Sequence, residues 1–285
     1  ISHRVISDFL LENSIIRSQI LFVCPSVVEY IIKVFFMYDY FFKSPQILSS
    51  FFFKESFCIF LTDNRYNSTL FELNKRGSIM TIISVRQMSP SAGKETLMEE
   101  RIRRASGVMA RYGAASRIFK ILGGESAGDY LLMNLYNSFS EASTSFQKYS
   151  TDPELAKLFM ERALNPAGDI TGPDLFRSVY GEPPEQPSPI LIGRGYQVPR
   201  GKVPDMLAMA PELEALFKKV DSSIGIVMPV IAADHEMMYI TYRFTSMDHL
   251  GSALDTMVEN QDFQNLITKA NELGTLKMSR MMSLM

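Results

Sequence analysis

The stretch TIISVRQMSPSAGK at residues 81–94 and the stretch PILIGRGYQVPRGK at residues 189–202 follow the same order of residue types, 108 residues apart. Each begins with a run rich in β-branched and apolar residues, typical of a strand, which proline then interrupts. Each ends in a Gly-Lys pair, Gly93-Lys94 or Gly201-Lys202, directly before an amphipathic helical pattern. A pattern that recurs at a fixed separation indicates internal duplication, so we predict two copies of one α+β unit of about 100 residues.

The remainder of each copy continues in the same order. The first copy is predicted to contain strands at 81–88, 116–122, 130–136 and 174–180, and helices at 95–112, from Ser140 and again from Asp152. The second is predicted to contain strands at 190–198, 224–231, 237–244 and 275–282, and helices at 206–220, 246–258 and from Asp262. Each copy is then β-α-β-β-α-β, the ferredoxin-like order, with the first at 80–181, a Pro-rich linker at 182–189 and the second at 190–285.

This order of elements also predicts how the two copies meet. A four-stranded antiparallel sheet with both helices on one face leaves its other face uncovered. Two such sheets can cover each other, and fusion places the partner in the same chain. We therefore predict an α+β protein in which two tandem ferredoxin-like units pack sheet to sheet as a pseudo-dimeric α/β barrel, with further self-association left open.

Residues 1–79 differ in composition from the rest of the chain. They contain no alanine, one glycine and two prolines, but many phenylalanines and isoleucines. Because an ordinary domain uses alanine and glycine heavily, we interpret residues 1–79 as a spurious or disordered extension and expect the protein to start near Met80. Two alternatives stay open, a degenerate membrane-associated segment and a real additional element. Charged residues such as Lys33 and Asp39 interrupt the apolar runs that a membrane span would need.

Charge and cysteine content narrow the functional class. The chain has 31 acidic and 29 basic residues, without blocks of either sign, so we expect no nucleic-acid partner. Both cysteines, Cys24 and Cys58, precede residue 80, so disulfides and thiolate chemistry are not expected beyond it. This usage fits a cytoplasmic setting. We expect no membrane partner for residues 80–285.

The chain resembles the dimeric α/β-barrel superfamily and its NIPSNAP-like branch in two features. The first is a strand followed by Gly93-Lys94 or Gly201-Lys202, and the second is the sequence TDPE at 151–154 before an apolar helix. The resemblance covers nearly all of residues 80–285 through short motifs. It implies a barrel with a pocket in each half. The superfamily includes cofactor-free monooxygenases, haem enzymes, small-molecule isomerases and proteins of no known activity, so fold alone does not name a function.

The chain departs from the active branches of that superfamily. It contains no tryptophan, so it lacks the Asn-Trp-Arg set of the antibiotic-biosynthesis monooxygenases, and it shows no convincing proximal histidine for haem. We expect no cofactor. We also expect no metal, because His235 and His249 have no third ligand at useful spacing. The G-x-S-x-G match at 124–128 precedes a predicted strand rather than a helix, which favours a hairpin turn over a hydrolase elbow.

The residues most suggestive of a site are Arg86 and Arg194, which occupy equivalent positions in the two copies. Strand alternation places Arg194 on one face with Ile190, Ile192 and Tyr196, so a guanidinium emerges from an apolar surface. It must meet a carboxylate, backbone carbonyls or an anionic ligand. A structural ion pair between sheets is the simpler alternative. The candidate residues for a ligand pocket in the barrel, with the catalytic residues left unknown, are Arg86, Asn134, Tyr136, Arg194, Tyr196 and Tyr242.

Two functions are compatible with these residues. The first is a non-catalytic role as a small-molecule binding or scaffold protein. The second is a cofactor-independent monooxygenase or isomerase that acts on a small, partly apolar, anionic substrate held by Arg86 or Arg194. A cavity reached by an arginine would keep the second hypothesis, whereas a solid core with both arginines paired to carboxylates would remove it.

Overall fold

The computed structural model describes residues 80–285. The interpretation of residues 1–79, the expected start near Met80 and both cysteines concern residues outside this part of the chain. Among the described residues, no helix is both long and apolar enough to cross a membrane.

Strands and helices alternate along the described chain as the sequence predicts. The strands are β1 (Ile82–Pro90), β2 (Ala115–Gly124), β3 (Tyr130–Tyr136), β4 (Gly168–Tyr180), β5 (Ile190–Gln197), β6 (Ser223–Ile231), β7 (Met237–Phe244) and β8 (Thr275–Leu284). The helices are α7 (Glu95–Arg111), α8 (Phe139–Tyr149), α9 (Pro153–Leu164), the 3-10 turn η3 (Arg200–Lys202), α10 (Val203–Ala208), α11 (Ala210–Lys218), α12 (Met247–Glu259) and α13 (Gln261–Leu273).

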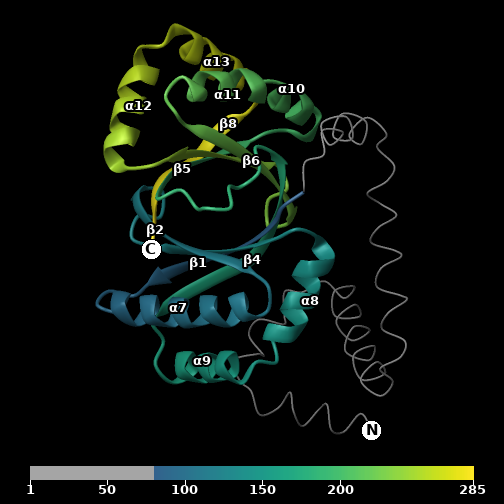
Figure 1. Cartoon of the computed structure of the whole chain (residues 1–285), viewed down its shortest axis with the longest axis vertical. Helices are drawn as coiled ribbons and strands as arrows, with labels where there is room; N and C mark the ends of the chain where they lie inside the picture. Colours follow the sequence, from purple (N-terminus) through teal and green to yellow (C-terminus); the bar gives the residue numbers. More distant parts are fainter. Residues whose placement is uncertain (1–79) are drawn as a thin grey trace, which may run out of the picture. The chain divides into compact units, whose positions relative to one another are not determined.

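The strands form a closed antiparallel barrel in the order β1-β3-β2-β8-β5-β7-β6-β4. Strands β1 to β4 are neighbours in the order β4-β1-β3-β2, and strands β5 to β8 in the matching order β8-β5-β7-β6. The two halves join through β2 with β8 and through β4 with β6. Helices α7 to α9 lie outside one half and α10 to α13 outside the other, with the barrel between them (Figure 1). The predicted α+β class and barrel are confirmed.

Short polar residues fix where several helices begin. Ser138 accepts a hydrogen bond from the backbone N–H of Glu141 at the start of α8, and Ser246 and Asn260 cap α12 and α13 in the same way. One predicted helix differs from the structure, because residues 206–220 are divided between α10 and α11. Pro211 lies in the first turn of α11, where its missing N–H and its ring end the preceding helix.

Strand β4 begins at Gly168, six residues before the predicted start, and this extension has a backbone cause. Gly168 has φ of 145°, and a Cβ atom there would overlap the carbonyl oxygen of Ser89 on β1. Only glycine allows the two backbones to approach so closely. The added residues lengthen the pairing of β1 with β4 to Pro90 opposite Gly168.

The linker between the halves is held by two arginines. Arg117 donates to the carbonyl oxygens of Pro184 and Glu185, and Arg243 donates to the carbonyl oxygen of Gly181 at 2.9 Å. Burial lowers the pKa of Arg243 to about 10, a value at which the guanidinium still carries its charge at neutral pH. The linker is therefore fixed against β2 and β7 by charge-assisted hydrogen bonds to its backbone.

Candidate active site between the first sheet and its helices

The candidate side chains face the helices, not the interior of the barrel. Asn134 donates to the sulfur of Met109 on α7, and Tyr136 accepts a hydrogen bond from Ser145 on α8. In the second half, the ring of Tyr242 lies 4.6 Å from that of Phe217 on α11. The expected location inside the barrel was therefore wrong. Strand alternation separates the two faces of a sheet but does not say which face the helices cover.

A cavity of about 390 Å³ lies between strands β1, β3 and β4 and helices α7 to α9. Most of its wall is apolar, and it reaches the surface beside Phe146 and Phe159, whose side chains are 50% and 59% exposed. The residues that carry charge in the wall are Arg86, Arg101 and Arg162, and no aspartate or glutamate lines it. An apolar space with cationic groups and no anionic ones favours a ligand that combines an apolar body with a negative charge.

Arg86 and Tyr149 form the polar end of this cavity. The Nη2 of Arg86 donates to the hydroxyl of Tyr149 at 3.1 Å, and its guanidinium carbon lies 6.0 Å from the centre of that ring. The Nη1 of Arg86 is buried and has no hydrogen-bond partner among the described residues. Because the tyrosine oxygen accepts from Arg86, its own proton is free to donate. Two donors are thus available to one oxyanion.

The matching space in the second half is filled by aromatic rings. Arg86 pairs with Leu132 on the adjacent strand and Arg194 pairs with Ile240, so the two arginines occupy the same register. At the separation of 108 residues, Asn134 is matched by Tyr242 and Met109 by Phe217. The ring of Phe217 contacts those of Tyr242 and Phe263. The Arg194 guanidinium lies 5.5 Å from the centre of the Tyr242 ring.

The second-half candidates are consequently packed into a core. Tyr196 and Tyr242 are each 2% exposed, and the Nε of Arg194 has no hydrogen-bond partner among the described residues. Burial raises the pKa of Tyr242 well above its ordinary value, so this hydroxyl stays protonated. Neither Arg86 nor Arg194 forms an ion pair with a described carboxylate. The structure brings the six candidates into two separate clusters. One lies beside a cavity, and the other lies beside aromatic rings packed at tilted and edge-on angles.

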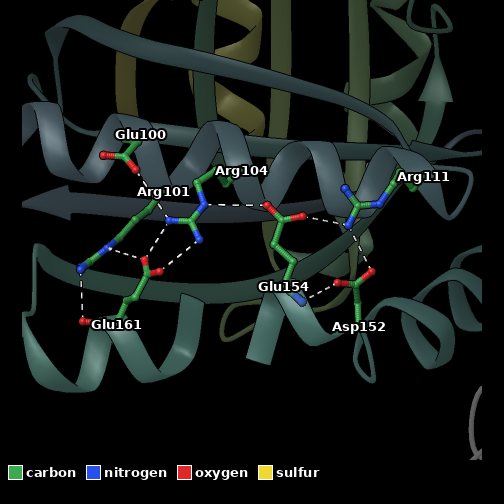
Figure 2. Close-up of polar contacts among 7 residues, drawn as sticks. All are labelled: Glu100, Arg101, Arg104, Arg111, Asp152, Glu154 and Glu161. Atoms are coloured by element: carbon green, nitrogen blue, oxygen red, sulfur yellow. Dashed lines mark hydrogen bonds and ion pairs between the residues drawn. The ribbon is translucent and has the colours of Figure 1, made fainter. Parts of the chain in front are cut away.

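Ion pairs join α7 to α9 and to Asp152 just before it (Figure 2). Both helices line the cavity, so these contacts hold its outer wall in place. Arg104 makes a two-pronged contact with Glu161, with distances of 2.8 and 3.2 Å. The hydrogen bonds from Arg104 hold the pKa of Glu161 below its usual range. Arg101, which lines the cavity, donates to the carbonyl oxygen of Asn165 at 2.7 Å beyond the end of α9. The roof of the cavity is therefore held by charge-assisted contacts.

Asp152 anchors the other end of the same roof. It caps α9 by accepting from the backbone N–H of Glu154 at 2.8 Å, and it also accepts from Tyr112 and Arg111 on the α7 side. Desolvation opposes ionisation, but these hydrogen bonds outweigh it and lower the pKa of Asp152. The cap, predicted from the Asp-Pro pair, thus also joins two helices.

The sequence did not reveal Tyr149, Arg101 or Arg162 as parts of a site. They lie on helices, and only tertiary packing turns them toward Arg86. The Nε2 of His249 lies 2.7 Å from the carbonyl oxygen of Val220, so this side chain joins α12 to the end of the segment that follows α11. His235 lies in the turn between β6 and β7. Among residues 80–285, no group of three or more histidines or acidic residues could hold a metal ion.

The fold defined by this barrel and its outer helices is that of the dimeric α/β-barrel proteins, which share the ferredoxin-like architecture. An anthrone oxidase-like protein superposes with a TM-score of 0.52 at 11% identity, covering 73% of this chain and 92% of that one. A candidate monooxygenase from Fusobacterium nucleatum gives 0.48 at 9% identity, with 72% and 92% covered. A candidate chlorite dismutase gives 0.45 at 9% identity, with 72% and 95% covered. No family model and no curated protein matches the sequence.

Proposed function

We propose that this protein binds a small amphipathic anion in the cavity under α7 to α9, with Arg86 and Tyr149 contacting the negative end. The carrying observation is the wall itself, which is mostly apolar and contains three arginines without a carboxylate. The buried Nη1 of Arg86 has no hydrogen-bond partner among residues 80–285, and a buried charged group without an acceptor is costly. An anionic ligand would supply the missing acceptor. Binding without turnover, as a carrier or scaffold, is the role that needs nothing further.

A thermal-shift and calorimetric titration with matched ligands tests this proposal. The probes are aromatic and medium-chain carboxylic acids, each beside its neutral amide. Wild-type protein should bind the acids, and Arg86→Gln should weaken binding about 10- to 100-fold, the value of a charged hydrogen bond of roughly 1.5–3 kcal/mol. Arg194→Gln removes the equivalent charge beside the filled space and is the matched control. Equal binding of acids and amides, or equal loss in both variants, would refute the proposal.

A second variant blocks the cavity without touching Arg86. The double substitution Met109→Phe with Asn134→Tyr copies the residues found 108 positions later, where rings fill the space. It should abolish acid binding while the far-ultraviolet spectrum and the unfolding transition stay cooperative. Full affinity in this folded variant would place the ligand elsewhere.

Catalysis is the second candidate, because the Nη1 of Arg86 has no hydrogen-bond partner among the described residues and Arg86 lines an open cavity. A cofactor-independent monooxygenase or isomerase would use Arg86 and the Tyr149 hydroxyl to stabilise an enolate or phenolate of the bound substrate. Oxygen uptake with hydroxylated aromatic acids, followed by product analysis, distinguishes turnover from binding. Oxygen uptake that requires Arg86 supports the monooxygenase, and an isomeric product formed without oxygen uptake supports the isomerase. Saturable binding with neither uptake nor product supports the carrier.

We also propose a closer affiliation and history for the chain. The matched strand orders of the two halves and the register shared by Arg86 and Arg194 support two tandem ferredoxin-like units that arose by duplication. The Gly-Lys pairs and the TDPE sequence support a NIPSNAP-like origin.

The absence of cysteine after residue 79 supports a cytoplasmic location. Imaging of the tagged natural protein tests the location.

A further inference from the structure

The barrel itself encloses a second cavity, of about 170 Å³, on the inner face of the sheet. One end of the interior is closed by packed apolar side chains, including Phe119, Leu131 and Met282. Gly193 on β5 faces this space and leaves it open, since a Cβ atom there would lie 3.1 Å from the terminal methyl of Met282. The volume equals that of about five or six liquid waters at roughly 30 Å³ each. It therefore fits a molecule with about that many non-hydrogen atoms.

Arg280 supplies a buried cation to this cavity. Its side chain is 13% exposed, and its Nη1 donates to the Oε1 of Gln87 at 3.3 Å. Gln87 is oriented by Asp129, which accepts from its Nε2 at 2.8 Å. Glu125 approaches Arg280 only to 3.7 Å and is half exposed, so it neutralises the charge weakly. The Nε of Arg280 is buried and has no hydrogen-bond partner in the described part of the chain, so one donor remains available to a ligand.

Asp174 supplies the opposite charge to the same cavity from β4. No hydrogen bond or ion pair joins its carboxylate to another described residue, and burial raises its pKa. Tyr239 also lines the space, and burial raises the pKa of its hydroxyl. The ion pair of Arg280 is with Glu125, not with Asp174. A cation and an anion, each short of partners, thus line one small space.

We propose that the barrel interior binds a small zwitterion, a molecule with one carboxylate and one ammonium group, of the size of a simple α-amino acid. Arg280 and Gln87 contact the carboxylate, and Asp174 contacts the ammonium. The buried Nε of Arg280 then gains an acceptor and the partly buried Asp174 gains a cation, which offsets the desolvation of both groups. The two cavities lie on opposite faces of the sheet and share only Gly172 in their walls, so the two ligands contact different side chains.

Calorimetric titration of the full chain with glycine, L-alanine and L-serine tests the proposal, with N-acetylalanine and alaninamide as probes that each lack one charge. Asp174→Asn keeps the side-chain shape and should weaken alanine binding at least about tenfold, as expected for a lost charged hydrogen bond. Arg280→Gln should do the same if it folds. Lys277→Gln, an exposed charge change on the same strand β8, is the control and should leave binding unchanged.

Several results would overturn the proposal. They are the absence of saturable binding at millimolar concentration, equal binding of either singly charged probe, and unchanged affinity in a folded Asp174→Asn protein. The Arg86→Gln variant should bind alanine normally. If Arg86→Gln loses the binding of carboxylic acids but keeps the binding of alanine, the two cavities are separate binding sites. A failed prediction for one cavity can then be told apart from a failed prediction for the other.

Discussion

The contrast between an open and a filled half predicts different costs for two matched truncations. Leu132 and Ile240 are 2% and 6% exposed, lie at the same register opposite Arg86 and Arg194, and face the helices. Substitution to alanine removes the same number of carbons from each. The lost transfer free energy is about 2.5 kcal/mol in both, from about three methylene equivalents at roughly 0.8 kcal/mol.

The free-energy cost of the cavity that each truncation leaves should differ between Leu132→Ala and Ile240→Ala. Leu132 already borders empty space, so its removal forfeits fewer contacts. Ile240 is buried on the same face of β7 as Tyr242, whose ring packs against Phe217, so its removal would leave a new void. We expect the free energy of unfolding to fall by about 2.5 kcal/mol for Leu132→Ala and about 4 kcal/mol for Ile240→Ala. Urea titration should show midpoints about 0.5 M apart at an m-value near 3 kcal/mol/M. Equal losses at unchanged m-value, or a larger loss for Leu132→Ala, would refute the assigned asymmetry.

Three further predictions concern stability. Hydrogen bonds from Arg104 lower the pKa of Glu161, so the contribution of this carboxylate to the free energy of unfolding is complete above the ordinary carboxyl pKa of about 4.3. That contribution is lost as the pH falls through the lowered pKa. In urea titrations at successive pH values, Arg104→Met should reduce the fall of the unfolding free energy with decreasing pH. Gly225→Ala places a methyl group against the Nη2 of Arg243 and should cost about 2 kcal/mol in denaturant unfolding. Gly107→Ala, in open space within α7, should instead raise stability by about 0.8 kcal/mol, and a lower melting temperature would contradict this.

The sequence predicted the order and most bounds of the elements because local patterns determine them. Strand β3 begins at Tyr130 and ends at Tyr136, as its run of apolar residues indicated. The break between α10 and α11 was missed because the apolar period continues past Pro211, although proline itself was the available signal. The early start of β4 depends on a close approach to β1, which no local pattern records.

The site was only partly predictable, for a different physical reason. Alternation grouped Arg194 with Ile190, Ile192 and Tyr196, and Arg86 was matched to it by position, but the existence of a cavity depends on volumes summed over several elements. Asn134 and Met109 leave space where Tyr242 and Phe217 fill it, and that difference appears only after the sheet and helices are packed. In the barrel interior, Arg280 shares its face of β8 with Met278 and Met282, just as Arg194 shares a face of β5 with apolar residues. The same alternation pattern could therefore have identified Arg280.

The covalent linker held by Arg117 and Arg243 has a consequence for specialisation. A barrel made of two identical chains carries every substitution twice, so a cavity opened in one half opens in the other and doubles the loss of packing. In a single chain the halves can diverge. One half can hold stacked rings and supply rigidity, while the other gives up packing for a binding space. A single-chain barrel is therefore free of the constraint that symmetry imposes on a barrel made of two identical chains.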